Sequence, residues 1–344
     1  MTDVSTVASM ASPLPRLLLL TTGGTIAGRG EASTNLNTYS AGALSGDALL
    51  AAVPEIAQLA CIEENAIASV DSADLQLAHW TALVERIRTA FADDPALTGV
   101  VVTHGTNTLE ETAWLLQLLI DDPRPVVLVG AMRPATALSA DGPLNLYQAV
   151  QVAVDPQARE RGVLAVLDGE VHAARAVTKR ATQGVGAFRC AGQGPLGWVD
   201  DAGVHWLAVP GRRWIPFGHL ALPSVWPQVA ILHGCVEPPA AFLPALLSSG
   251  VRGLVFTGTG AGQLSAVERE ALAHWDGPLP LMLRANRCGS GPVHRCVDHA
   301  DLGLLPAGTL SPQKARVLLL LALIAKFSKA ELEAVLLKLG LAGG

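Results

Sequence analysis

The segment from Val100 to Trp114, VVVTHGTNTLEETAW, constrains the fold of this chain more than any other stretch. It begins with three successive valines, which is the composition of a strand buried on both faces of a parallel sheet. The turn His104–Asn107 then combines hydrogen-bonding side chains with one glycine, and a helical pattern follows over residues 109–119. This order of strand, polar turn and helix predicts one unit of an α/β fold. Ligands of such folds bind at the turn, outside the carboxyl end of the strand.

The polar residues of this turn have two interpretations. Thr106 would sit where a helix presents free backbone N–H groups to a ligand. Thr106 and Asn107 can equally do no more than cap the helix, and Thr108 with Glu111 has the spacing of a capping box. The turn alone therefore does not separate a functional site from a helix start.

The same order of elements recurs along the first half of the chain. We expect strands at residues 17–22, 67–70, 100–102, 126–129 and 162–167, with helices at 47–51, 75–92, 109–119 and 144–154. Strands that alternate with helices in this way predict a parallel sheet with right-handed crossovers.

Length and composition predict two domains. A chain of 344 residues, half of them hydrophobic, is longer than one core usually accommodates. Between residues 194 and 227, Pro, Gly and Trp interrupt the periodic pattern, which is typical of a linker, and three further strands are expected at 229–232, 253–257 and 280–283. We predict a larger N-terminal α/β domain with a parallel sheet (1–207), a linker (208–226) and a smaller C-terminal α/β domain (227–344).

The charge pattern limits the class of partner. The formal net charge is −6 and Lys and Arg do not cluster, so neither nucleic acid nor an anionic membrane is an expected partner. No segment has the roughly eighteen uninterrupted apolar residues of a membrane span. A small neutral or zwitterionic molecule is the expected ligand.

Cysteine usage and the N-terminus bear on the compartment. The five cysteines are odd in number and scattered, in a chain too large to need a disulfide framework. The first twenty residues lack the basic segment and the small-residue cleavage site of a secretory signal. We therefore expect a cytoplasmic protein.

Several expected strand ends carry hydroxyl or amine side chains that can meet in one crevice: Thr25, Ser72, Thr106 and Lys179. The loop Gly23–Gly28 fits neither GxGxxG nor GxxxxGK, so a nucleotide is not expected, but Gly24 allows close backbone approach to a ligand. A threonine hydroxyl becomes nucleophilic when a base takes its proton, and a lysine with a pKa lowered by burial can do so. This set of side chains predicts nucleophilic acyl transfer.

A polar loop follows the glycine-rich segment. Residues 29–42 contain Tyr39, one of two tyrosines in the chain. Long polar loops of this kind often cover an active site. We expect this loop to be disordered without ligand and to bring Tyr39 over Thr25 when it closes.

Four blocks of sequence together resemble one family, the bacterial L-asparaginase/glutaminase family of threonine amidohydrolases. The blocks are TTGGTIAG (Thr21–Gly28), THGTNTLEETA (Thr103–Ala113), VGAMRPATALSADGPLNLYQAV (Val129–Val150) and LSPQKARVLLLLAL (Leu310–Leu323). The resemblance covers the chain from about Leu17 to its end. It is greatest to the family's periplasmic form, although this chain shows no export signal.

The resemblance implies a reaction and roles for individual residues. A threonine attacks the side-chain amide, ammonia leaves an acyl-enzyme, and water releases the acid, with neither metal nor organic cofactor. The matching catalytic residues are Thr25 as nucleophile, Tyr39 on the lid, and Thr106 and Lys179 as a second hydroxyl–base group. The matching substrate-binding residues are Gly24, Ser72 for the α-carboxylate, and Gly105 through its backbone. The family fold is a larger and a smaller α/β domain, in a homo-oligomer (a dimer of dimers) that shares active sites.

The departures from the family pattern fall on the sub-site for the substrate's α-ammonium. Asn107 stands where the family has Asp, and Ala73 where it commonly has Gln or Glu. Asp298 is the candidate for a Glu donated by the neighbouring subunit. We expect poor affinity for L-asparagine, restored by Asn107→Asp, unless Asp298 or Asp74 supplies the missing charge.

Other interpretations remain open at this point. A metal site could use Cys288, His294, Cys296 and His299, although their spacing fits no common zinc pattern. The chain could also hydrolyse an amide that lacks a free α-ammonium, or bind amino acids as a catalytically weakened sensor.

Overall fold

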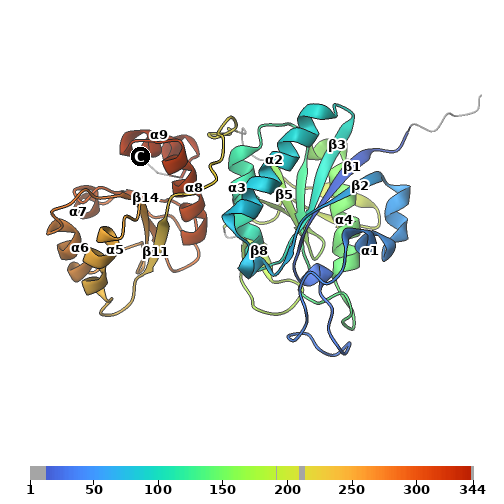
Figure 1. Ribbon diagram of the computed structural model, residues 1–344, viewed down its shortest axis with the longest axis horizontal. Coiled ribbons are helices and arrows are strands. Elements are labelled where there is room, and N and C mark those ends of the chain that lie inside the picture. Colours follow the sequence, from blue (N-terminus) through green and yellow to red (C-terminus); the bar gives the residue numbers. More distant parts are fainter. Residues whose placement is uncertain (1–12, 191, 209–213, 342–344) are drawn as a thin grey trace, which may run out of the picture.

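The computed structural model describes residues 13–190, 192–208 and 214–341. These residues form two α/β domains, each built around its own sheet (Figure 1). The expectations for the N-terminal tail, and for residues 209–213 of the predicted linker, fall outside the described ranges.

Among the residues described, eight strands form the N-terminal sheet, in the order β10-β9-β6-β5-β4-β3-β1-β2. Their bounds are β1 (Arg16–Gly23), β2 (Cys61–Val70), β3 (Leu97–Thr103), β4 (Val126–Val129), β5 (Val163–Leu167), β6 (Glu170–Ala173), β9 (Gly197–Asp200) and β10 (Gly203–Trp206). Strands β1 to β5 pair in parallel, which agrees with the predicted fold class.

Antiparallel strands β6, β9 and β10 extend this sheet, and the sequence pattern did not predict them. Asp168 and Gly169 have φ angles of 51° and 74°, so they form a tight turn that folds β6 back onto β5. The hairpin of β9 and β10 lies within residues 194–227, where only irregular structure was expected. These strands have four residues each, too few to show a clear alternation.

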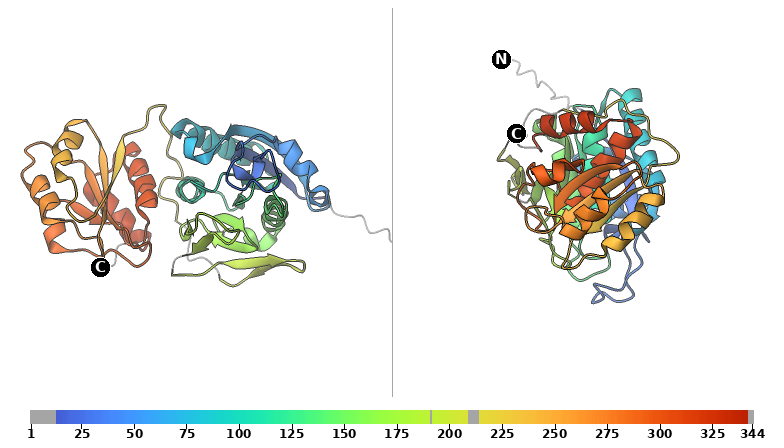
Figure 2. Two further views of the ribbon diagram at one scale, coloured as in Figure 1. Left: turned by 90° about the horizontal axis from the view of Figure 1, so that it is seen from below. Right: turned by 90° about the vertical axis from the view of Figure 1, so that its left-hand side faces the viewer.

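Helices cover both faces of the N-terminal sheet (Figure 2). On one face lie α2 (Leu77–Asp93) and α3 (Leu109–Leu119), and on the other α1 (Gly46–Ala51) and α4 (Gly142–Val154). The three valines of β3 are fully buried, as their composition predicted. Helix α3 starts at the predicted residue, but the predicted capping box is wrong, because the Thr108 hydroxyl donates to the backbone oxygen of Ser72 instead (2.9 Å).

The C-terminal sheet is parallel, with the order β11-β12-β13-β14. Its strands are β11 (Val229–His233), β12 (Gly253–Gly258), β13 (Leu281–Asn286) and β14 (Leu304–Pro306), and the helices of this domain are α5 (Leu243–Ser248), α6 (Ala266–Ala273), α7 (Val297–Ala300), α8 (Pro312–Ile324) and α9 (Lys329–Lys338). No helix in the described part of the chain is long and apolar enough to cross a lipid bilayer.

Helix α8 connects the two domains. Its apolar side chains belong to the same buried cluster as α2 and α3 of the N-terminal domain. Lys314 of α8 is fully buried, and its ammonium donates to the backbone oxygens of Ala174, Arg175 and Val177 in the N-terminal domain. Burial lowers the pKa of Lys314 to about 8. The smaller domain is therefore held against the larger one by both apolar and polar contacts.

Candidate active site

Glycines let three loops meet at the carboxyl ends of β1, β2 and β3. Gly24 has a φ of 80°, a conformation that favours glycine, and a Cβ there would collide with the backbone of Gly105. A Cβ on Gly105 would lie 2.6 Å from the Ser72 hydroxyl oxygen. The backbones of the three loops thus approach more closely than side chains would permit.

Thr25 begins the short 3-10 helix η1 (Thr25–Ala27), directly after these glycines. The residue is buried, and its hydroxyl oxygen lies 2.7 Å from the hydroxyl oxygen of Tyr39. Two backbone hydrogen bonds between Arg29 and Ser40 close the loop that carries Tyr39. In Figure 1 this loop is the dark blue segment that projects beyond the strand ends between β1 and α1. Tyr39 therefore contacts Thr25, whereas the ligand-dependent closure of the loop stays a prediction.

A second hydroxyl group is paired with the lysine. Lys179 is the last residue of β7 (Val177–Lys179), which pairs with β8 (Phe188–Cys190). Its ammonium donates to the Thr106 hydroxyl (2.8 Å) and to the side-chain oxygen of Asn107 (3.0 Å). Burial lowers the pKa of Lys179, and the negative charge of Asp71 partly opposes this shift.

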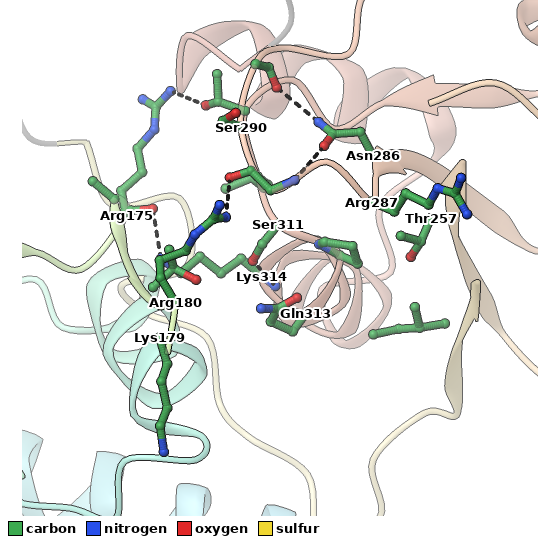
Figure 3. Close-up of a pocket in the computed structure, with 18 of the residues that line it drawn as sticks. Arg175, Lys179, Arg180, Thr257, Asn286, Arg287, Ser290, Ser311, Gln313 and Lys314 are labelled. Carbon is green, nitrogen blue, oxygen red and sulfur yellow. Dashed lines mark hydrogen bonds between the residues drawn. The ribbon is translucent and has the colours of Figure 1, made fainter. Parts of the chain in front are cut away.

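Neighbouring residues of β7 and its continuation point in different directions. In Figure 3, Lys179 extends away from the C-terminal domain, whereas Arg180 turns toward it and donates to the backbone oxygen of Gly289 (3.0 Å). The cavity in that figure lies between the domains, and both Lys179 and Arg180 contribute to its lining. Lys179 therefore lines both this cavity and the one that contains Thr25, whereas Arg180 contacts the C-terminal domain.

One cavity of about 250 Å³ brings the predicted catalytic residues together. Its lining includes Thr25, Tyr39, Thr106 and Lys179, together with Asn107. Of the other predicted substrate-binding residues, Gly24, Ser72, Ala73 and Gly105 belong to the adjoining loops and do not line the cavity. Ser72 is joined to the lining residue Asn107, because its hydroxyl oxygen accepts a hydrogen bond from the Asn107 backbone N–H (3.1 Å).

Asp298 lies apart from this cavity. It is an exposed residue of α7 in the C-terminal domain and does not line the cavity of its own chain. Its predicted role at a neighbouring subunit's site stays a prediction.

Sequence reasoning missed part of the lining. Met132 and Arg133 line the cavity from the loop after β4, and Thr182, Gln183 and Gly184 line it from the loop after β7. The carboxylate of Asp141 accepts from the backbone N–H groups of Met132 and Arg133 (2.9 Å each), which fixes the first of these loops. Their position after strand ends is the signal that would have found them.

Asp71 is a further residue whose role was not assigned. It caps the 3-10 helix η3 (Ser72–Asp74) through a hydrogen bond from the Ala73 N–H (2.8 Å). The same carboxylate oxygen accepts from the side-chain amide of Asn107 (3.1 Å). Within its own chain, the acidic group that contacts the changed sub-site is thus Asp71 and not Asp74.

His104 stabilises the turn through hydrogen bonds of both ring nitrogens. It is completely buried, and its Nδ1 lies 2.7 Å from the Gly105 backbone oxygen. Its Nε2 lies 2.9 Å from the Thr112 hydroxyl, which in turn accepts a hydrogen bond from the Trp80 indole (2.9 Å). Burial lowers the pKa of His104 to about 4, so the ring is neutral and structural at physiological pH.

The metal-site alternative finds no cluster of donors. Within residues 13–190, 192–208 and 214–341, no three His, Cys, Asp or Glu side chains are close enough to hold an ion. His299 is buried and accepts from the backbone N–H of Leu264 (3.3 Å), which gives it a structural role.

The fold and the site define a two-domain α/β protein with two hydroxyl groups and a lysine in one cavity. Two family models match the chain, the asparaginase N-terminal domain at residues 16–211 and the glutaminase/asparaginase C-terminal domain at residues 228–336. The chain therefore belongs to the asparaginase family, and the resemblance drawn from its motifs is confirmed.

Individual relatives cover almost the whole chain. It is 42% identical over 318 residues to a protein of Haemophilus influenzae named probable periplasmic L-asparaginase, an alignment that covers 91% of this chain and 90% of that protein. It is 38% identical over 318 residues to L-asparaginase 2 of Escherichia coli, with the same coverage of 91% and 90%. The crystal structure of a probable cytoplasmic L-asparaginase from Campylobacter jejuni superimposes with a TM-score of 0.88 at 36% identity, covering 94% of this chain and 99% of that one.

Proposed function

We propose that this chain hydrolyses the side-chain amide of asparagine, with glutamine as a second candidate substrate, to the acid and ammonia. The observation that carries the proposal is the cavity in which Thr25 contacts Tyr39 at 2.7 Å and Thr106 contacts Lys179 at 2.8 Å. Each hydroxyl has a neighbour that can exchange a proton with it, which is the arrangement that nucleophilic catalysis needs. Membership in the asparaginase family supports the same chemistry.

In the proposed reaction Thr25 is the nucleophile. Its oxygen attacks the amide carbon while its proton passes to a basic group in the cavity. The leaving nitrogen takes a proton and departs as ammonia, and the acyl group stays on Thr25. Water then attacks the acyl-enzyme: its hydroxyl joins the acyl carbon, the bond to Thr25 breaks to release the acid, and the other proton of the water passes to the Thr25 oxygen. No step requires a metal or an organic cofactor.

The proposed role of Lys179 is to hold and accept a proton at Thr106. Burial lowers its pKa, so a larger fraction of the amine is neutral than for an exposed lysine. The hydrogen bond of 2.8 Å joins this amine directly to the Thr106 hydroxyl. Thr106 and Lys179 thus form the second proton-transfer group, opposite Thr25 and Tyr39.

A second candidate function follows from the side chains present at the ammonium sub-site. Asn107 lines the cavity with a neutral amide, and Ala73 has no polar side chain. Both residues favour an amide without a free α-ammonium. A sensor that binds amino acids without turnover is the remaining alternative.

Ammonia release measured over a panel of amides tests these functions. The panel contains asparagine, glutamine, D-asparagine, succinamate and N-acetyl-asparagine, with Thr25→Ala as the matched inactive control. Release from asparagine that Thr25→Ala abolishes supports the proposal. Release only from succinamate or N-acetyl-asparagine supports the second function, and tight binding without release from any amide supports the sensor.

We also propose a homo-oligomer, a dimer of dimers, in which Asp298 serves a neighbouring site. Asp298 is exposed on α7 and does not line the cavity of its own chain, which supports this assignment. Light scattering during gel filtration tests the mass, and mixing Asp298→Ala with Thr25→Ala subunits tests the shared site.

For the compartment we propose the cytoplasm. The five cysteines, all within the described ranges, are free thiols, which supports a reducing environment. Fractionation of the native host into periplasmic and cytoplasmic extracts checks this proposal.

A further inference from the structure

The carboxylate of Asp71 stands at one end of a chain of hydrogen bonds that leads to the proposed base. Asn107 donates from its side-chain nitrogen to Asp71 (3.1 Å), and its side-chain oxygen accepts from Lys179 (3.0 Å). Lys179 in turn donates to the Thr106 hydroxyl (2.8 Å). The residue that caps η3, the turn after β3 and the end of β7 are thus joined by hydrogen bonds.

The amide of Asn107 has two different ends, and Asp71 determines which one faces the lysine. A carboxylate accepts hydrogen bonds but cannot donate them, so it binds the NH₂ end of the amide. The oxygen end is then directed at the Lys179 ammonium, where it is a good acceptor. If the amide flipped, its NH₂ group would face the ammonium and two donors would oppose each other.

Asp71 is itself held in place. Its bond from the Ala73 N–H (2.8 Å) fixes one carboxylate oxygen at the start of η3, and the residue is only partly exposed. Asp74, three residues later, is exposed, and its side chain forms no hydrogen bond with the described residues. The two aspartates therefore differ in contact with the site although they share one short segment.

We propose that Asp71 is a positioning residue that replaces the carboxylate absent at position 107: it orients the Asn107 amide toward Lys179 and supplies the negative charge of this sub-site. The inference rests on the proposed function, because it assigns Lys179 as a base. The effect of Asp71 on the pKa of Lys179 can be measured without any turnover.

The test removes the negative charge at position 71. Asp71→Asn keeps an acceptor for the Asn107 amide but removes the charge, so the pKa of Lys179 falls further. For two unit charges several ångströms apart in a largely solvated site, we expect a shift on the order of half a pH unit. Asp74→Asn is the matched control and leaves the pKa of Lys179 unchanged.

Other titratable or charged side chains near Lys179 stay constant in this comparison. Tyr39 of the lid loop and Arg133 after β4 line the same cavity, and Arg180 follows Lys179 in the chain. None of them is replaced. A difference between Asp71→Asn and Asp74→Asn therefore reports on Asp71.

The measurement is the pH titration of lysine side chains by ¹³C NMR in the full chain. The chain has few lysines, which makes the spectrum tractable: Lys179, Lys314, Lys326, Lys329 and Lys338. The Lys179 signal is assigned from its loss in Lys179→Met. A lower pKa in Asp71→Asn than in the wild type and in Asp74→Asn supports the inference, and an unchanged pKa overturns it.

Kinetics supply a second readout that a purely structural role would not move. If neutral Lys179 is required, the acidic limb of kcat shifts to lower pH in Asp71→Asn, equally for asparagine and succinamate. Asp71→Ala removes both the charge and the acceptor that orients the Asn107 amide, so its kcat should be lower than that of Asp71→Asn. If Asp71→Asn changed only the KM for asparagine and left the acidic limb of the kcat profile unchanged, the positioning role would be refuted. Absence of ammonia release by the wild type would refute the proposed function while leaving the NMR test decisive.

Discussion

Acidification should destabilise this protein through one buried histidine. His104 is completely buried and has a pKa of about 4, against 6.5 for an exposed histidine, because burial disfavours the imidazolium. The neutral ring donates from Nδ1 to the Gly105 backbone oxygen and accepts at Nε2 from Thr112. A second proton on the ring would make Nε2 a donor, so the Thr112 hydroxyl, which also accepts from Trp80, would have to turn its own proton away from the ring. Protonation is therefore disfavoured by desolvation, and the hydrogen bond to the Gly105 backbone oxygen opposes this shift only in part.

The magnitude follows from linkage between protonation and folding. Between pH 6.5 and 4 the unfolded chain binds a proton at this histidine and the folded chain does not. The stability that the fold gains from keeping His104 neutral is fully present above pH 6.5, and it is lost as the pH falls toward 4. With about 1.4 kcal/mol for each pH unit, the free energy of unfolding should fall by about 3 kcal/mol over this interval.

Urea unfolding at pH 7, 5.5 and 4.5 measures this loss in the wild type and in His104→Asn. The variant cannot gain the proton, so its free energy of unfolding should fall less with pH than that of the wild type. His172, whose pKa burial also lowers to about 4, contributes equally to both proteins and cancels in the difference. Substitution of the exposed His294 is the control and should leave the wild-type dependence intact. Equal losses in the wild type and His104→Asn would refute the argument.

Three further predictions concern activity, the lid and the contact between the domains. Thr25→Ala should abolish nearly all ammonia release while the circular dichroism spectrum stays unchanged, and Thr106→Ala should be similarly severe because the two hydroxyls act as a unit. Aspartate should protect the 29–42 loop from limited proteolysis, whereas cleavage indifferent to saturating aspartate would contradict a mobile lid. Lys314 has a pKa of about 8 against 10.5 when exposed, so the wild type should gain stability between pH 8 and 10.5, and Lys314→Met should lack this gain in urea unfolding.

The sequence predicted the part of the site that depends on strand ends. Thr25 and Thr106 follow neighbouring parallel strands, and because the carboxyl ends of parallel strands share one edge of a sheet, their convergence could be expected. Lys179 instead ends β7, which pairs antiparallel with β8 in a separate two-stranded sheet, so this rule does not explain its position. Asp71 also follows a strand, but periodicity does not tell which of Asp71 and Asp74 faces the site. That choice depends on the local 3-10 turn, in which Asp71 caps the Ala73 N–H and so points toward Asn107.

Short antiparallel elements and side-chain caps were less predictable, for different physical reasons. Strands β9 and β10 have four residues each, which is too short for alternation to be distinguished from irregular chain. The spacing of Thr108 and Glu111 fits a capping box, yet the Thr108 hydroxyl binds the Ser72 backbone from another loop. Local sequence cannot include a partner that lies 36 residues away.

The contact between Asp71 and Asn107 also changes what Asn107→Asp should do. The sequence alone predicts that this substitution restores affinity for asparagine. In the structure the Asn107 amide nitrogen lies 3.1 Å from a carboxylate oxygen of Asp71, so a second carboxylate would meet the first at nearly that distance. Two like charges so close repel by about 1 to 5 kcal/mol, depending on how well water screens them.

We therefore expect Asn107→Asp alone to give little gain in affinity and to lower the melting temperature. The double variant Asp71→Asn/Asn107→Asp removes the repulsion, because the new amide at position 71 can donate to the new carboxylate. It also places the negative charge directly against Lys179, which contacts the side-chain oxygen of residue 107 at 3.0 Å. The KM for asparagine should fall in the double variant and not in the single one. If Asn107→Asp alone lowers the KM as much as the double variant does, repulsion from Asp71 does not limit this sub-site.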